Sequence, residues 1–134
     1  MPRQAINPAS MYESVPFGFS HAVKRSGRTT IHCAGQTAWD KDRNIVGLND
    51  LAAQTAQVLE NLKTVLAEAG ATPADVVRMR TYVVNHSPDK LEVICSAISK
   101  FYGDVPPAPN TLIGVQALAL PEFLIEIEAT AVID

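Results

Sequence analysis

The chain has 134 residues, of which 47% are hydrophobic and 19% are charged, and its formal net charge is −3 at pH 7. This length predicts one domain over residues 1–134, because it allows one hydrophobic core and is too short for two. The weakly acidic charge, with no basic cluster, argues against nucleic acid as a partner.

No targeting or membrane segment is evident along the chain. Residues 1–7 lack the apolar run of a signal peptide, and no later stretch approaches the roughly 18 apolar residues that span a bilayer. We therefore expect a cytoplasmic protein with no membrane partner. Cys33 and Cys95 lie far apart and share no metal-ligand spacing, so we expect reduced, buried thiols without a disulfide or a metal.

The first third of the chain predicts strands followed by a loop. Residues 17–24 and 28–34 flank a short segment that contains Gly27, which predicts a β-hairpin with its turn at the glycine. Residues 35–44 are rich in turn formers, so Trp39 should lie on irregular structure. A loop anchor is the preferred interpretation of Trp39, and a pocket wall is the alternative.

A long amphipathic helix is predicted next. Asn49 or Asp50 can cap its start, and Gly70 can end it. Apolar residues at spacings of three and four give the helix one buried face, formed by Leu51, Val58, Leu59, Leu62, Val65, Leu66 and Ala69.

A central strand and a second helix follow. Residues 76–84 alternate, which places Val77, Met79, Thr81 and Val83 on one side of a strand. The second helix should begin near Pro88 and end at Gly103. Its apolar stripe consists of Leu91, Ile94, Cys95, Ile98 and Phe101.

The C-terminal third predicts a stiff loop and two strands. Residues 104–110 are rich in proline and lead into a strand at 111–116, and a last strand spans 123–133. The order of elements predicts an α+β fold, in which one mixed sheet carries both helices on one face. The other face mixes apolar and charged residues, which suits burial against another subunit, so we expect a homo-oligomer with any cleft at the subunit boundary.

Three segments carry a family resemblance. They are residues 19–23 leading to Ala34-Gly35-Gln36, the long helix ending before a valine-rich strand, and residues 124–131. Together, in this order, they resemble the Rid family (reactive intermediate deaminase, YjgF-like). The resemblance implies a chorismate-mutase-like fold and a homotrimer with small-molecule sites between subunits. It also implies a hydrolase that deaminates reactive enamines and imines in metabolite detoxification, without metal or cofactor.

The resemblance assigns roles to particular residues. Glu126 corresponds to the acidic residue that holds the attacking water, and Gly35 and Leu112 would line the pocket with backbone groups. Thr111 is placed in the same substrate site as Leu112.

Several positions depart from the pattern of the active members. Phe19 stands where they have a tyrosine, Ala34 where they have a serine, and Cys95 where they have an asparagine. Asn110 stands where an arginine grips the substrate carboxylate, and no arginine lies between residues 81 and 134. These changes make the predicted pocket more apolar and imply a different ligand.

Alternative interpretations stay open. Glu126 can instead be a structural carboxylate paired with Arg78 or Arg80, and Cys95 on an apolar stripe is better explained as a core residue than as a nucleophile. For the whole protein, the first hypothesis is a Rid-like hydrolase and the second is a non-catalytic trimer that binds a small molecule. A ribonuclease activity, attributed to some relatives, is disfavoured by the acidic charge.

Overall fold

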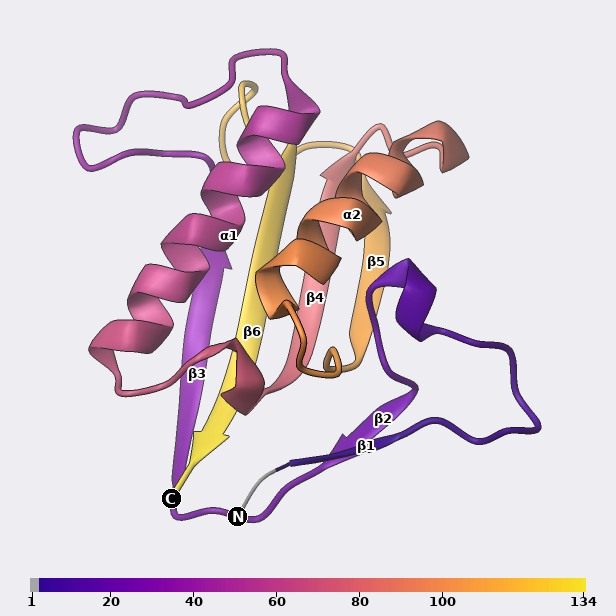
Figure 1. Cartoon of the computed structure of the whole chain (residues 1–134). Coiled ribbons are helices and arrows are strands. Elements are labelled where there is room, and N and C mark those ends of the chain that lie inside the picture. The colour runs from indigo at the N-terminus through magenta and orange to yellow at the C-terminus, as the bar shows by residue number, and fades with distance from the viewer. Residues whose placement is uncertain (1–2) are drawn as a thin grey trace.

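The computed structural model describes residues 3–134 and shows two helices lying across one face of a four-stranded sheet (Figure 1). The strands are β3 (Thr29–Gln36), β4 (Val76–Val84), β5 (Asn110–Val115) and β6 (Ile125–Ile133), in the order β3-β6-β4-β5. Strands β4 and β5 are parallel, whereas β6 runs antiparallel to both β3 and β4. The sheet is therefore mixed, and residues 76–84 form an inner strand, as predicted. Residues 1–2 of the predicted domain lie outside the described residues.

The predicted hairpin between residues 17–24 and 28–34 is wrong. Strand β2 (Ala22–Lys24) pairs with β1 (Gln4–Ile6) in a separate two-stranded sheet, and a short 3-10 turn, η1, covers Val15–Phe17. Strand β3 pairs instead with the long strand β6. Gly27 passes so close to β6 that a Cβ there would lie 2.6 Å from Val132 Cγ1. The glycine thus lets the chain cross the end of β6 on its way from one sheet to the other.

Both helices end where the sequence predicts, and the first also begins there, but the second begins three residues after Pro88 because its predicted first turn is a 3-10 turn. Helix α1 (Leu51–Glu68) is capped by Asp50, which accepts a hydrogen bond from Ala53 N at 3.0 Å, and it ends before Gly70 at φ +81°. Helix α2 (Leu91–Tyr102) follows a 3-10 turn, η3 (Pro88–Lys90), and ends at Gly103. A further 3-10 turn, η2 (Pro73–Asp75), leads from α1 into β4.

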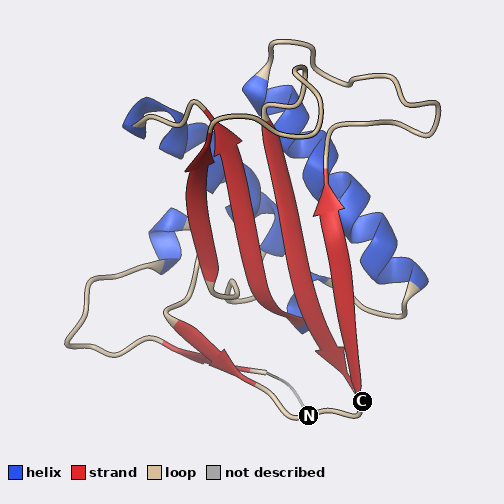
Figure 2. Ribbon diagram, turned by 180° about the vertical axis from the view of Figure 1, so that it is seen from behind, coloured by secondary structure: helices blue, strands red, loops and turns tan. Residues whose placement is uncertain are grey.

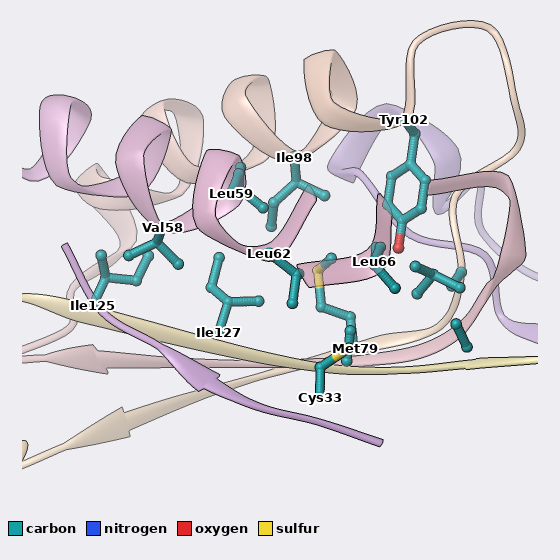
Figure 3. Packing of buried hydrophobic residues seen from close by; sticks show 14 of the residues in the cluster. Cys33, Val58, Leu59, Leu62, Leu66, Met79, Ile98, Tyr102, Ile125 and Ile127 are labelled. Atoms are coloured by element: carbon teal, nitrogen blue, oxygen red, sulfur yellow. The ribbon is translucent and has the colours of Figure 1, made fainter. Parts of the chain in front are cut away.

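The hydrophobic core lies between the helices and the sheet, as Figure 3 shows for Val58 and Leu62 of α1 over Ile125 and Ile127 of β6. All four side chains are fully buried, and each contributes roughly 1.5–3 kcal/mol by leaving water. Two details differ from the prediction. A bulge between residues 76 and 78 turns Val76 toward the core in place of Val77, and α2 buries Tyr102 more completely than Phe101.

One buried polar residue of α1 holds the loops at one end of the sheet. Gln54 is fully buried and donates to the backbone oxygens of Gly47 at 3.1 Å and Glu122 at 2.9 Å. Its Oε1 accepts from Leu124 N at 2.9 Å, just before β6 begins. Both N–H donors and the oxygen of this amide are thereby used to fix two loops and the start of a strand.

The second face of the main sheet has no helix over it (Figure 2). This open face carries alternate residues of β4 and β6, including Arg80, Tyr82, Glu126 and Glu128, all of which are half-buried. None of the helices within residues 3–134 has the length and apolar character of a membrane span.

Candidate functional site

The carboxylate of Glu126 lies directly over a glycine of the neighbouring strand. Gly35 sits in the irregular register of β3 between Cys33 and Gln36, and a Cβ at Gly35 would overlap Glu126 Oε2 and lie 2.8 Å from Cδ. Only a glycine leaves this space free for the carboxyl group. Burial raises the pKa of Glu126 above its usual 4.5, and the nearby Glu128 carboxylate raises it further.

The structural interpretation of Glu126 required an ion pair with Arg78 or Arg80. Within residues 3–134, neither arginine forms an ion pair with Glu126. Arg80 lies opposite Glu128 in the sheet, and the hydroxyl of Tyr82 donates to that same glutamate. The pairing expected for a purely structural Glu126 is therefore not found.

Glu126 opens into a cavity of about 780 Å³ between β3, β6, α1 and two loops. Trp39 lines this cavity and packs edge-to-face on Phe123, with ring centroids 5.2 Å apart, so it is both a loop anchor and a pocket wall. Asn61 of α1 fixes the loop by donating to the backbone oxygens of Thr37 at 3.0 Å and Trp39 at 2.9 Å.

Most of the predicted substrate-binding residues line a different cavity, of about 520 Å³. Phe19, Cys95 and Asn110 lie on its wall together with Thr111 and Leu112 of β5. The cavity is also lined by two exposed aromatic residues that the sequence did not single out, Tyr12 and Phe17. No periodicity marks these two aromatic residues, because the segment before β2 forms an irregular strap and only its fold brings them over α2.

Among residues 3–134, no charged side chain lines this second cavity. Its most polar group is the Asn110 amide, whose Oδ1 accepts a hydrogen bond from the Thr81 hydroxyl at 3.1 Å. Burial raises the pKa of the Cys95 thiol, which disfavours the thiolate and argues against Cys95 as a nucleophile. Cys33 is buried as expected, but Cys95 is only half-buried and lines the cavity, so it is not the core residue that its apolar stripe predicted.

All the predicted site residues except Ala34 are thus divided between two cavities. Gly35 and Glu126 lie toward the β3 edge of the sheet, while Asn110 and its neighbours lie at the β5 edge, on the other side of Figure 1. Ala34 is exposed on β3 beside Gly35. No group of three or more histidine, cysteine or acidic side chains within residues 3–134 could hold a metal ion.

Two helices on one face of this mixed sheet, with an open second face, define an α+β protein of the YjgF-like fold. Residues 13–133 match the family described as Endoribonuclease L-PSP, and the chain belongs to this family, which contains the Rid proteins.

Similar proteins cover almost the full chain. The Rid family protein YyfB of Yersinia pestis is 64% identical, with a TM-score of 0.97 over 99% of this chain and 100% of that one. A YjgF-type family member from Mycobacterium tuberculosis is 31% identical, with a TM-score of 0.65 over 98% of this chain and 99% of that one. A RutC family protein of Pyrococcus abyssi is 35% identical over 120 residues, which are 87% of each chain.

Proposed function

We propose that this protein is a Rid-like hydrolase that cleaves a small reactive imine or enamine with water. The observation that carries the proposal is the Glu126 carboxyl group, which is half-buried, unpaired with either neighbouring arginine and held over Gly35 at the mouth of a cavity. A strand carboxylate with only a packing role does not need a glycine beneath it.

The raised pKa of Glu126 suits an acid that also acts as a base. In the proposed reaction, the protonated carboxyl group donates to the imine nitrogen while its other oxygen accepts a proton from the attacking water. The carbinolamine that forms then loses ammonia as Glu126 returns a proton to the nitrogen and takes one from the hydroxyl group. The net reaction converts the imine and one water into a carbonyl compound and ammonia.

We further propose that the site is completed between two copies of the chain in a homotrimer. Within one chain, the Glu126 cavity and the Asn110 cavity lie toward opposite edges of the sheet, so one substrate cannot contact both. The open face supports assembly, because the buried Nε of Arg80 has no hydrogen-bond partner within residues 3–134. In the proposed trimer, a neighbouring copy covers the half-buried polar residues of this face and supplies hydrogen-bond partners to them.

Ammonia release from freshly generated imines tests the activity. We would use imines of an amino acid and of its amide, and compare wild type with Glu126→Gln and with the control Glu68→Gln at an exposed site on α1. The proposal expects release above the uncatalysed rate in wild type and the control, and a loss of at least about a hundredfold in Glu126→Gln. Release that is unchanged in Glu126→Gln would contradict it.

A non-catalytic binding trimer is the second candidate, and the uncharged wall around Asn110 favours it. It predicts saturable binding of small molecules with no ammonia release from either imine. The ribonuclease activity in the family's description is a separate hypothesis, which a salt-dependent RNA-binding assay would exclude if it showed no affinity.

A further inference from the structure

The strand β4 contributes one polar side chain to the wall behind the Asn110 cavity. Thr81 is fully buried on the helix-facing side of the sheet, between Met79 and Val83. Strand β5 runs parallel beside it, with Asn110 opposite Met79 and Leu112 opposite Thr81. The Thr81 hydroxyl therefore reaches Asn110 from beneath the cavity rather than from inside it.

The bond between these two residues orients the amide. The Thr81 hydroxyl donates to Asn110 Oδ1 at 3.1 Å, so the oxygen of the amide is occupied by a buried partner. An asparagine side chain has an acceptor oxygen and a donor nitrogen, which point in different directions. With its oxygen held by Thr81, Asn110 is left to offer its N–H groups, and these have no partner within residues 3–134.

The other residues that line the cavity determine which kind of ligand can accept a hydrogen bond from these N–H groups. Three aromatic rings, from Tyr12, Phe17 and Phe19, face apolar side chains of α2 and β5. A carboxylate placed here would lose water without gaining a cation, which is unfavourable. A neutral oxygen acceptor on an apolar body would gain a hydrogen bond from Asn110 and bury its apolar part.

We infer that the Asn110 cavity binds an uncharged carbonyl group attached to an apolar body, and that Thr81 is the positioning residue that turns the Asn110 amide toward it. This inference rests on the proposed hydrolase. It identifies the substrate as an imine or enamine whose neighbouring carbonyl group belongs to a ketone, ester or amide and not to a free carboxylate. Among the described residues that line the two cavities, one cation is found, Lys41, and it lines the Glu126 cavity together with Asp40.

Three probes of nearly equal shape test the inference on the full, assembled chain. Acetophenone carries a neutral acceptor, benzoate carries a charged one, and isopropylbenzene carries none. Methyl NMR signals of Ile94, Ile98 and Leu112, which line the cavity, would report where each probe binds. We expect wild type to bind acetophenone about tenfold more tightly than benzoate, a difference of roughly 1.4 kcal/mol.

Variants separate the role of Thr81 from general packing. Thr81→Val should weaken the binding of acetophenone about threefold to tenfold and leave the affinity for isopropylbenzene unchanged. Thr81→Ser, which keeps the hydroxyl group, should bind acetophenone as wild type does. Asn110→Arg should bind benzoate more tightly than acetophenone, which reverses the order expected for wild type. Lys41→Ala should change none of these affinities.

Several results would overturn the inference. They are benzoate binding as tightly as acetophenone, isopropylbenzene binding as tightly as acetophenone, loss of benzoate binding in Lys41→Ala, and Thr81→Val weakening every probe equally. Absence of binding by all three probes would overturn it as well. The hydrolase proposal is judged separately by ammonia release and Glu126→Gln, so either proposal can fail without the other.

Discussion

The carboxyl group of Glu126 occupies the space that a side chain at Gly35 would need: an added Cβ would overlap Oε2 and lie 2.9 Å from Cγ. The two residues come from neighbouring strands, β6 and β3, at the point where their regular pairing is interrupted. This close approach links a backbone irregularity to the position of the proposed acid. A substitution of Gly35 therefore tests whether that position matters for the reaction.

Gly35→Ala should displace the Glu126 carboxyl group while leaving the fold intact. The clash falls on the flexible end of a half-buried side chain, so we expect the free energy of unfolding to change by no more than about 1 kcal/mol. Ammonia release should fall on the order of tenfold to a hundredfold, because the carboxyl group loses its position. The matched control is Gly114→Ala in β5, whose Cβ would lie 3.2 Å from His86 Cβ. Equal ammonia release in the two variants would show that Gly35 does not position the Glu126 carboxyl group for the reaction.

Glu126 should make the stability of the protein depend on pH in a particular direction. Its pKa is raised in the folded state, so the folded protein binds more protons than the unfolded chain between the ordinary value of 4.5 and the raised one. The contribution of Glu126 to stability is then lost as the pH rises through that interval. Relative to wild type, Glu126→Gln should become progressively more stable across the interval and level off above it.

Urea denaturation at a series of pH values would measure this difference, with Glu68→Gln as the exposed control. The control should show no comparable trend. A difference that is independent of pH, or that grows toward acid, would show that the folded state does not raise the pKa of Glu126.

Gln54→Ala should destabilise the fold more than an ordinary polar truncation on α1. It removes the partners of Gly47 O, Glu122 O and Leu124 N and leaves a cavity, which we expect to cost about 2–4 kcal/mol. Gln57→Ala is the control, because that half-buried side chain donates to Asn61 Oδ1 alone. Denaturant titration would measure the free energy of unfolding of both variants. Equal decreases in the two variants would refute the role given to Gln54.

The sequence predicted those elements that have long, regular patterns. Helix α1 and the inner strand β4 follow from spacing, and the caps at Asp50 and Gly103 follow from residue type. The three-residue strands β1 and β2 have too little pattern to show their pairing, so β2 was assigned to the wrong partner. Gln54 is not part of the apolar face that the spacing predicted for α1, because its burial depends on loops far along the chain.

The candidate site was predictable only in part for the same reason. Glu126 and Asn110 could be singled out by resemblance, but their division between two cavities follows from the strand order, which no local pattern encodes. Thr81 shared the alternation of a core strand and gave no sign of its bond to Asn110, which depends on the parallel register of β4 and β5.

The most direct test of the account asks whether one functional site is built from two copies of the chain. Glu126→Gln disables one cavity, and the isosteric change Asn110→Asp disables the other by replacing its donor with an anion. The two variants, each low in activity, would be unfolded, mixed in equal amounts and refolded together. Random assembly pairs an intact Glu126 with an intact Asn110 of a neighbour in about a quarter of the sites, so about a quarter of the wild-type ammonia release should return. A mixture no more active than its components, under conditions where refolded wild type is active, would show that the site is not shared between subunits.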